Sequence, residues 1–372
     1  MHLKELRLIN FKNYDELRLN FTSKINCFTG RNGIGNTILL DAIFYLSVCK
    51  SYLNPIDSHN IRFNEDFFVI QGAYDRKGKQ ENIYCGMKRN RKKKFTRNDK
   101  EYPRLSDHIG FLPVVMISPY DSALILEGSE ERRRFMNGVI SQYDHPYLEN
   151  VIRFNKALQQ RNKLLKDFHK ANTFDIEMLN LWDEQLIQYG QPVYQKRKEF
   201  AEELVPIFQK YYSAVSRDHE KVELTYDSPL HGQDYRQLLN DSVEKDRIIQ
   251  HTSVGIHKDD LIFSLSGYPV KKMGSQGQQK TFLVALKMAQ FEFLRTISGL
   301  TPILLLDDIF DKFDKERVEE IIRLVSDDQF GQIFITDTNP QRLREIIKTV
   351  DIEHTVFHLK GNGDMKIELE RI

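Results

Sequence analysis

The sequence predicts an α/β protein whose strand-rich head is divided by a helical insertion. Three observations lead to this fold class. Short strand patterns fill both ends of the chain, the middle is rich in helix formers and charge, and "PILLLDD" (302–308) has the continuous apolar run of a buried parallel strand. The chain has 372 residues, which is enough for two lobes. We expect three segments: 1–128 and 252–372 as the two halves of the head, and 129–251 as a helical arm.

The first half of the head begins with three strand patterns, "LKELRLINF", "DELRLNF" and "KINCFTG". Apolar spacing then predicts a helix over Thr37–Cys49. The segments "DFFVIQGAYD", "ENIYCGMKRN" and "GFLPVVMISP" predict three more strands, the last of which is closed by Pro119. This half therefore combines a sheet with one strong helix.

The composition changes near Ser129, where helix-forming residues dominate. Val151, Leu158 and Leu165 stand seven apart, which is the spacing of a coiled-coil seam. Phe154, Arg161 and Phe168 have the same spacing, and Arg161 interrupts the seam. A second helical stretch runs from about 173 to 216. Two long helices that return on each other predict a coiled-coil-like arm, with a plain helical subdomain as the alternative.

Strand patterns return after residue 252. "DLIFSLSGYPV" is followed by the helical pattern "QQKTFLVALKMAQFEFLRTI", by the apolar strand "TPILLLDDIF", by another helix and by "GQIFITDTN". A strand-rich head is thus split in sequence by the helical insertion.

The composition excludes several classes of protein. The chain is 40% hydrophobic and 29% charged, with a net charge of +1. No apolar run reaches the length of a membrane span, and "MHLKELRLINF" is too charged for a signal peptide. Cys27, Cys49 and Cys85 are too scattered for a disulfide framework or a metal site. We therefore expect a cytoplasmic protein.

The segment "GRNGIGNT" (30–37) differs at one position from the phosphate-loop pattern G-x-x-x-x-G-K-[ST]. Glycines there let backbone N–H groups approach phosphate oxygens at a helix N-terminus, and Thr37 supplies a hydroxyl for Mg²⁺. Asn36 replaces the lysine, and one lost charge-assisted hydrogen bond costs about 1.5–3 kcal/mol, or one to two decades in affinity. A tight strand–helix turn is the alternative. The predicted nucleotide-binding residues here are Gly30, Arg31, Asn32, Gly33, Ile34, Gly35, Asn36 and Thr37.

Two later segments suit the same chemistry. Asp307 ends an apolar strand where a carboxylate can hold Mg²⁺, and Asp308 stands where a general base would polarise water. Paired acids after an apolar run also occur by chance. "GSQGQQKT" (274–281) opens a helix and offers N–H groups and a hydroxyl to an anion, although a solvent-exposed loop has the same composition. The order of the three segments favours one nucleotide site.

The segment "KRNRKKKFTRNDK" (88–100) contains eight Lys or Arg in thirteen residues and lies between strand patterns. Such a cationic hairpin binds nucleic acid through counterion release, while a solvated hairpin balanced by acids elsewhere is the alternative. The predicted DNA-binding residues are Lys88, Arg89, Arg91, Lys92, Lys93, Lys94 and Arg97. "EERRRF" (130–135) is a second candidate, although its glutamates can pair with its arginines. For His257 in "GIHKDDL" we favour a structural role.

These segments together resemble an ATP-binding-cassette (ABC) ATPase of the chromosome-maintenance type, and more narrowly the RecF family of bacterial recombination mediators. The resemblance covers essentially the whole chain. It depends on "INCFTGRNGIGNT", "SPYDSALILEGSEERRRFMN", "YLENVIRFNKALQQRN", "GIHKDDL", "GSQGQQKTFLVALKMAQ" and "PILLLDDIFDKFD". Transporter ATPases have no such arm. The implied fold is an ABC-type head with a mixed sheet core, split by the arm.

The resemblance implies roles for individual residues. Residues 30–37 would wrap the phosphates of ATP, Thr37 and Asp307 would hold Mg²⁺, and Asp308 would be the catalytic carboxylate. The signature residues Ser275, Gly277 and Gln278 would reach the γ-phosphate of a nucleotide held by a second subunit. ATP would then join two copies into a homodimer, with Asp314 across the interface.

The resemblance also implies binding to double-stranded DNA and to single-strand/double-strand junctions, with RecA loaded at gaps with RecO and RecR. The chain departs from the family pattern at Asn36 and Ile38. Its switch residue must be Thr336 or Asp337, and the loop after "VVMIS" offers only Tyr120, Asp121 and Ser122. We therefore predict weak ATP hydrolysis. The alternative is a DNA-binding scaffold that has lost nucleotide control.

Overall fold

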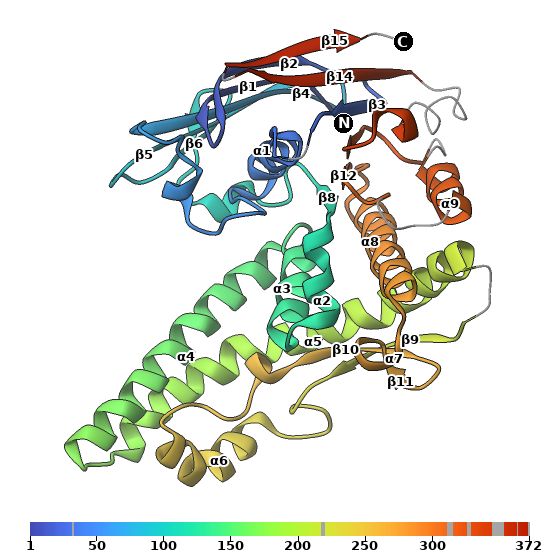
Figure 1. Cartoon of the computed structure of the whole chain (residues 1–372). Helices are drawn as coiled ribbons and strands as arrows, with labels where there is room; N and C mark the ends of the chain where they lie inside the picture. Colours follow the sequence, from blue (N-terminus) through green and yellow to red (C-terminus); the bar gives the residue numbers. More distant parts are fainter. Residues whose placement is uncertain are drawn as a thin grey trace. The chain divides into compact units, whose positions relative to one another are not determined.

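The structure is a computed structural model that describes residues 1–31, 33–216, 220–310, 315–325, 329–343, 353–362 and 364–370 (Figure 1). The chain forms two compact units. Unit 1 comprises Met1–Asp121, Ala214–Arg217 and Val284–Ile372, and unit 2 comprises Ser122–Ser213 and Asp218–Leu283. None of the described helices combines the length and the apolarity that crossing a bilayer would require.

Unit 1 contains an antiparallel sheet of six strands in the order β2-β1-β4-β5-β6-β7. Its strands are β1 (His2–Phe11), β2 (Tyr14–Asn20), β4 (Phe67–Arg76), β5 (Lys79–Lys88), β6 (Lys94–Arg97) and β7 (Lys100–Glu101). From Glu16 to Asn20 the side chains of β2 alternate between exposed and buried positions, as expected for a sheet with one covered face.

The second sheet of unit 1 has the order β15-β14-β3-β13-β12-β8. Its strands are β3 (Ile25–Thr29), β8 (Val114–Ile117), β12 (Ile303–Asp307), β13 (Ile333–Asp337), β14 (His354–Asn362) and β15 (Asp364–Glu370). β14, β3, β13, β12 and β8 pair in parallel, and β15 is antiparallel to β14. Every residue of β3, β8, β12 and β13 is buried, which explains their continuous apolar sequences. Parallel pairing places the carboxyl ends of these four strands at one edge.

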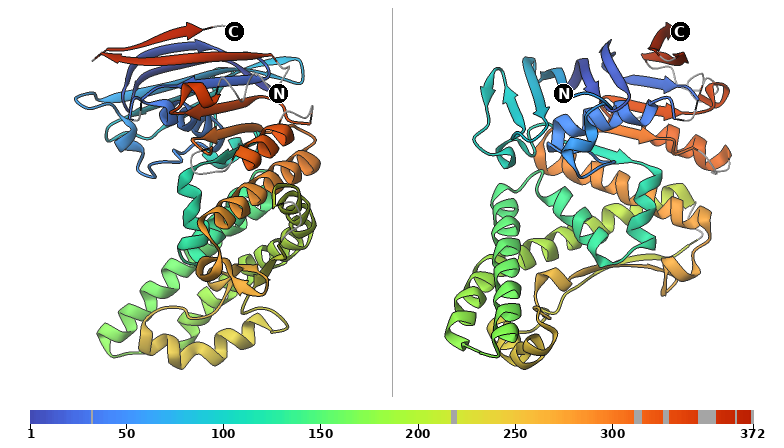
Figure 2. Two further views of the ribbon diagram at one scale, coloured as in Figure 1. Left: turned by 45° about the vertical axis from the view of Figure 1, so that its right-hand side comes forward. Right: turned by 60° about the vertical axis from the view of Figure 1, so that its left-hand side comes forward.

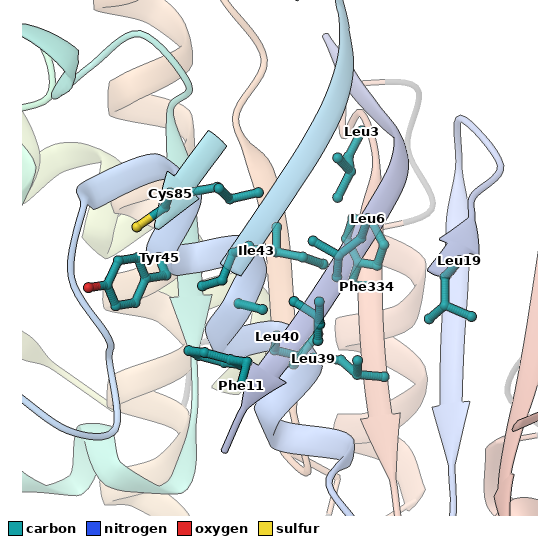
Figure 3. Close-up of a cluster of buried hydrophobic side chains, with 14 of the residues drawn as sticks. Leu3, Leu6, Phe11, Leu19, Leu39, Leu40, Ile43, Tyr45, Cys85 and Phe334 are labelled. Carbon is teal, nitrogen blue, oxygen red and sulfur yellow. The ribbon is translucent and has the colours of Figure 1, made fainter. Parts of the chain in front are cut away.

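Helix α1 (Asn36–Val48) packs against strands of both sheets of unit 1. Figure 3 shows Leu39, Leu40 and Ile43 of this helix among Leu6 and Phe11 of β1 and Phe334 of β13. Because α1 is apolar on most of its circumference, it is stable only as a buried helix. Burial of each such side chain contributes about 1.5–3 kcal/mol. The core therefore fixes the start of α1, which follows the predicted phosphate loop.

The remaining elements of unit 1 are short or shared. They are η1 (Asp57–Asn60), η2 (Leu105–His108), α9 (Lys315–Val325), most of η3 (Pro119–Ser122) and the part of α8 (Gln276–Ser298) from Val284 onward.

Unit 2 combines helices with a small antiparallel sheet of order β11-β10-β9 (Figure 2). The strands are β9 (Val222–Asp227), β10 (Asp260–Leu265) and β11 (Tyr268–Pro269). The helices are α2 (Ala123–Leu126), α3 (Ser129–Ile140), α4 (His145–Ala171), α5 (Ile176–Ser216, with its last residues in unit 1), α6 (Tyr235–Ile249), η4 (Ile256–Lys258), α7 (Val270–Met273) and the start of α8.

Arg161 explains the interruption in the apolar seam of α4. Its side chain is fully buried, and Nε donates to Asp183 of α5 at 2.5 Å while Nη1 donates to Asp246 of α6 at 2.6 Å. Three helices therefore meet at one cation. The predicted pair of long helices exists, but a third helix is tied to it, so unit 2 is more than a two-helix coiled coil.

The division of the chain differs from the expected segments 1–128, 129–251 and 252–372. Residues 252–283 group with the helices rather than with the head. The reason is strand pairing, since β10 pairs with β9 along its length. Two ion pairs strengthen the grouping, Arg132–Asp260 and Arg197–Asp259. The expected helical arm is therefore a unit of helices and strands.

The expected helix after Ser129 is also divided. α3 ends at Ile140 and α4 starts at His145. The Asp144 carboxylate accepts a hydrogen bond from the Tyr147 backbone N–H, and Pro146 occupies the first turn. Both features mark a new helix start.

Candidate nucleotide site and basic hairpin

The turn between β3 and α1 requires glycine at two positions. Gly33 has φ +81° and Gly35 has φ +122°, a region that other residues enter at a cost. The Tyr14 hydroxyl donates to the Gly35 carbonyl at 3.2 Å and would lie 3.0 Å from a Cβ at position 35. Asn32 lies outside the described residues.

A cavity of about 310 Å³ opens at this turn in unit 1. Phosphate-loop residues, Asn13 and the ends of β12 and β13 surround it. Its lining residues are Asn13, Arg31, Gly33, Gly35, Asn36, Thr37, Ile38, Asp308, Thr336, Asp337 and Thr338. The structure thus brings the phosphate loop (30–37) and the acidic end of β12 together, because β3, β13 and β12 are parallel neighbours.

Asp307 connects the phosphate loop to the acidic strand. The Thr37 hydroxyl donates to Asp307 Oδ1 at 2.8 Å, and the Thr336 hydroxyl donates to the same oxygen at 2.8 Å. The Ser118 hydroxyl donates to Oδ2 at 3.1 Å. Burial raises the pKa of the Asp307 carboxyl, and the three hydroxyl hydrogen bonds oppose that rise. A buried carboxylate beside a threonine hydroxyl is a hard-oxygen pair suited to Mg²⁺.

Sequence reasoning missed Ser118. In the loop after β8, the sequence indicates only Tyr120, Asp121 and Ser122 as candidates. Tyr120 is 65% exposed. Asp121 is buried and accepts hydrogen bonds from the Ser118 backbone N–H and the Tyr52 hydroxyl, with Lys287 Nζ at 2.6 Å. A polar residue directly after "VVMI" was the available signal, since that position ends a parallel strand.

Asp308 lines the cavity in a strained backbone conformation, with φ +45°. Its backbone N–H donates to the Thr336 hydroxyl at 3.0 Å. Arg342 Nη2 lies 3.9 Å from Asp308 Oδ1 and also donates to buried Asp337, which receives a second bond from Arg342 Nε. Sequence reasoning missed Arg342, because nothing in its local pattern predicts this pairing.

Asn36 leaves the cavity wall without a cation at the position of the missing lysine. Its side chain is 8% exposed, and Nδ2 donates to the Gly30 carbonyl at 3.4 Å, which is long for a hydrogen bond. Its Oδ1 is buried and has no hydrogen-bond partner among the described residues. An unpaired buried amide oxygen is unfavourable, and the Asn36 amide supplies no positive charge where the phosphate-loop pattern requires lysine.

The predicted signature residues lie in unit 2. The Gln278 side chain accepts from the Ser275 backbone N–H at 2.7 Å, and the Ser275 hydroxyl accepts from the Gln278 backbone N–H at 3.3 Å. This reciprocal pair is a capping box that starts α8. Ser275 is exposed and Gly277 is half-buried, while Gln278 also donates to Glu220 at 2.8 Å. Asp314 lies outside the described residues.

Comparisons with known proteins identify the family. Residues 2–358 match the family described as RecF/RecN/SMC N terminal domain. The chain is 54% identical over 360 residues to the DNA replication and repair protein RecF of Bacteroides thetaiotaomicron, covering 96% of this chain and 97% of that protein. The chain belongs to the RecF family. The RecF protein of Phocaeicola vulgatus is 53% identical over 359 residues, 96% of either chain.

A solved RecF structure confirms the fold. A structure described as the recombination mediator protein RecF-ATP in RecFOR pathway superimposes with a TM-score of 0.88 at 28% identity, covering 99% of this chain and 97% of that one. The predicted fold class, an ABC-type head with a mixed sheet split by a helical insertion, is therefore correct for this RecF-family chain.

The basic segment of this RecF-family chain forms the expected hairpin, since β5 and β6 pair antiparallel. Two of its seven predicted DNA-binding cations form ion pairs, and Arg89 Nε donates to the Glu65 carbonyl at 3.0 Å. Lys93 Nζ lies 2.8 Å from an Asp57 oxygen and donates to the Tyr45 hydroxyl, and Arg97 forms two hydrogen bonds with Glu81. The exposed cations that remain are Lys88, Arg89, Arg91, Lys92 and Lys94.

The second basic candidate, "EERRRF", and His257 are both held by internal contacts. Arg132 and Arg134 of "EERRRF" pair with Asp260 and with the two glutamates of the same helix, as the sequence alternative anticipated. Arg133 donates to the Asp259 carbonyl. His257 Nε2 lies 3.0 Å from the Thr252 carbonyl, and burial lowers the pKa of His257 to about 4. A neutral histidine held by a backbone carbonyl suits the structural role that we predicted.

Proposed function

We propose that this chain is an ATP-controlled DNA-binding protein of DNA replication and recombinational repair. The observation that carries the proposal is the 2.8 Å hydrogen bond from Thr37 to Asp307, because it unites the phosphate loop and the acidic strand in one cavity. The names of the RecF relatives support a role in DNA replication and repair. The description of the solved relative names ATP, which supports the nucleotide.

The cavity has the groups that ATP and Mg²⁺ need. Backbone N–H groups of the glycine-rich turn and of the first turn of α1 would bind phosphate oxygens, as they do at other helix N-termini. Thr37 and Asp307 would hold Mg²⁺, which when bound neutralises phosphate charge. Asp308, at the cavity wall, would accept a proton from the attacking water.

Asn36 supports weak hydrolysis within this proposal. Loss of the lysine removes a charge that would stabilise phosphate oxygens both in the bound state and in the transition state. The same substitution favours one alternative function, a DNA-binding scaffold without nucleotide control, because the neutral Asn36 brings no positive charge to the phosphates.

The dimeric part of the proposal concerns the start of α8. Ser275 is exposed. The first backbone N–H groups of this 23-residue helix have no carbonyl of a preceding turn to bind, so they can donate to a ligand. We propose that Ser275, Gly277 and Gln278 bind the nucleotide of a second copy, which makes the homodimer dependent on ATP.

The exposed side of the basic hairpin is the proposed DNA surface. Lys88, Arg89, Arg91, Lys92 and Lys94 can neutralise DNA phosphates without breaking an internal ion pair. We propose double-stranded DNA and single-strand/double-strand junctions as ligands, and RecR and RecO as partners in loading RecA at gaps in the cytoplasm. The description of the solved relative, which names the RecFOR pathway, supports these partners.

The test is DNA binding measured against salt concentration, with and without ATP and Mg²⁺, for the parent chain and for Asn36→Lys. We expect ATP to tighten DNA binding in both proteins, and at lower ATP concentration in Asn36→Lys. If ATP changes DNA affinity only in Asn36→Lys, the scaffold function is correct for the parent. If neither protein binds ATP, the nucleotide site itself is wrong.

The hairpin is tested separately by replacing its five exposed cations with glutamine. The slope of log K against log[salt] should become shallower by up to about 4.5, since each phosphate contact contributes about 0.9. The control replaces five exposed cations of α4, Arg153, Lys156, Lys163, Lys166 and Lys170. An equal loss in the control would show that the hairpin is not the main DNA surface.

A further inference from the structure

The nucleotide cavity contains an unusual balance of charge. Among the described residues that line it, the ionisable ones are two carboxylates, Asp308 and Asp337, and one cation, Arg31. The position that normally holds lysine is the neutral Asn36. A triphosphate brings further negative charge, so its binding depends on the cations that can reach it.

Two cations of the described chain that lie outside the cavity lining, Arg342 and Lys12, are paired with buried acids. Arg342 makes two hydrogen bonds with Asp337, which is fully buried. Lys12 Nζ lies 2.5 Å from an oxygen of buried Asp41. Moving either cation onto a phosphate would leave a buried carboxylate without its partner, which is costly.

Arg31 differs from these residues. It lies at the start of the turn, five positions before Asn36, and its side chain is exposed. Among the described residues, its guanidinium has no hydrogen bond or ion pair with a protein group. An arginine can form two parallel hydrogen bonds with a phosphate and remains charged at all relevant pH values.

We propose that Arg31 supplies the phosphate-binding cation that the substitution at position 36 removes. This inference rests on the proposed ATP-binding function and assigns a role to one side chain within it. Arg31 would bind the phosphates from the mouth of the cavity, whereas a lysine at position 36 would bind them from its wall. The two cations would therefore substitute for each other, and the effect of removing Arg31 should depend on residue 36.

The experiment is a double-mutant cycle with the full-length chain: parent, Arg31→Ala, Asn36→Lys and the double variant. Affinities for ATP with Mg²⁺ and for AMP are measured by calorimetry. In the parent background, Arg31→Ala should weaken ATP binding by about 10- to 100-fold, the range for one charge-assisted hydrogen bond. In the Asn36→Lys background the loss should be less than about threefold, because the lysine holds the phosphates. AMP affinity should change little in either background.

Arg18→Ala is the matched control, since Arg18 of β2 belongs to the same unit, is 67% exposed at its side chain and does not line the cavity. Thermal unfolding of every variant checks the fold. If the parent binds ATP and Arg31→Ala binds it equally well, or if the loss is the same in both backgrounds, the inference is wrong and the proposed function stands. If neither the parent nor Asn36→Lys binds ATP, the proposed function fails as well.

Discussion

The carboxylate of Asp307 shows how single residues assemble the proposed nucleotide site. Three hydroxyls, from Thr37, Thr336 and Ser118, donate to its two oxygens. Only Thr37 belongs to the phosphate loop, so the three hydrogen bonds contribute differently to stability and to nucleotide binding. All three stabilise a buried charge, but the Thr37 hydroxyl also stands where Mg²⁺ would bind.

Thr37→Val and Ser118→Ala therefore form an informative pair. Each removes one hydrogen bond to Asp307, so each should destabilise the fold by about 1–3 kcal/mol. Thr37→Val should in addition lower ATP affinity in the presence of Mg²⁺ by about tenfold or more, with little change in EDTA. ATP titrations with Mg²⁺ and with EDTA measure the two affinities of each variant. An equal Mg²⁺-dependent loss in Ser118→Ala would place the metal elsewhere.

His108 predicts a pH dependence of stability. It is fully buried, with Nε2 2.7 Å from the Leu46 carbonyl and Nδ1 3.1 Å from the Tyr102 hydroxyl. Burial lowers the pKa of His108 from 6.5 to about 4. Between these values only the unfolded chain takes up the proton, so the free energy of unfolding should fall as the pH drops through this window, by on the order of 3 kcal/mol.

The measurement for His108 is urea denaturation at several pH values, with His108→Gln as the comparison. Glutamine can keep a donor for the Leu46 carbonyl but does not titrate. Its stability should depend less on pH between about 6.5 and 4. Identical pH profiles for the two proteins would contradict the assignment.

The sequence predicted which groups lie close together where a local motif marks them, but not where tertiary pairing decides. The spacing of the glycines and Thr37, and an aspartate after an apolar strand, identified groups that the structure brings together. Lys93 was grouped with the DNA-binding cations because its sequence neighbours are basic. Its partner Asp57 is 36 positions away, a pairing that composition does not reveal.

At the scale of elements, the parallel strands were the easiest to predict. β3, β12 and β13 are buried on both faces, so each reads as an unbroken apolar run. β14 and β15 were not predicted, because "HTVFHLKGN" and "DMKIELE" mix charge with apolar residues and only pairing defines them. The break between α3 and α4 was missed for a similar reason, since both sides favour helix.

Arg161 joins three helices, α4, α5 and α6, so we predict that its replacement destabilises unit 2. Arg161→Met would leave the carboxylates of Asp183 and Asp246 buried without their cation, at a cost of about 3–5 kcal/mol. The single tryptophan, Trp182, lies beside Asp183 in α5 and reports the unfolding of this unit. Urea denaturation followed by its fluorescence should show a much lower midpoint.

Arg153→Met on the same helix is the matched control. Arg153 pairs with Glu149 one turn away and is 56% exposed at its side chain, so the change should cost less than about 1 kcal/mol. If the two variants unfold at the same urea concentration, the buried cation does not hold the three helices together.

At the scale of the whole molecule, the sequence predicted the order of head, insertion and head but not where they divide. Unit 2 closes through β9 and β10, whose partners are 33 positions apart at Asp227 and Asp260. Long-range strand pairing of this kind has no local signature. The boundaries near 128 and 251 followed changes in composition, whereas contacts place them at 121 and 283.

The proposed dimer gives the whole-molecule prediction. Asp308→Asn should slow hydrolysis while leaving the phosphate loop intact, so that ATP-bound chains accumulate. In this background, sedimentation with ATP and Mg²⁺ should show about twice the mass of one chain, and sedimentation without nucleotide should show one chain. Because ATP would contact both copies, the midpoint of assembly should move to lower protein concentration as ATP rises.

Ser275 decides whether the start of α8 takes part in that dimer. Ser275→Arg places a bulky side chain at an exposed position beside the first helical turn, so it should abolish the ATP-dependent dimer while each copy still binds ATP in its own cavity. Thr296→Arg adds the same side chain at an exposed site near the other end of α8 and should leave assembly unchanged. A Ser275→Arg protein that still dimerises with ATP would show that the signature residues serve only as the cap of α8, which their mutual hydrogen bonds already explain. Loss of both dimer and ATP binding would instead mean that Ser275 acts on the nucleotide of its own chain.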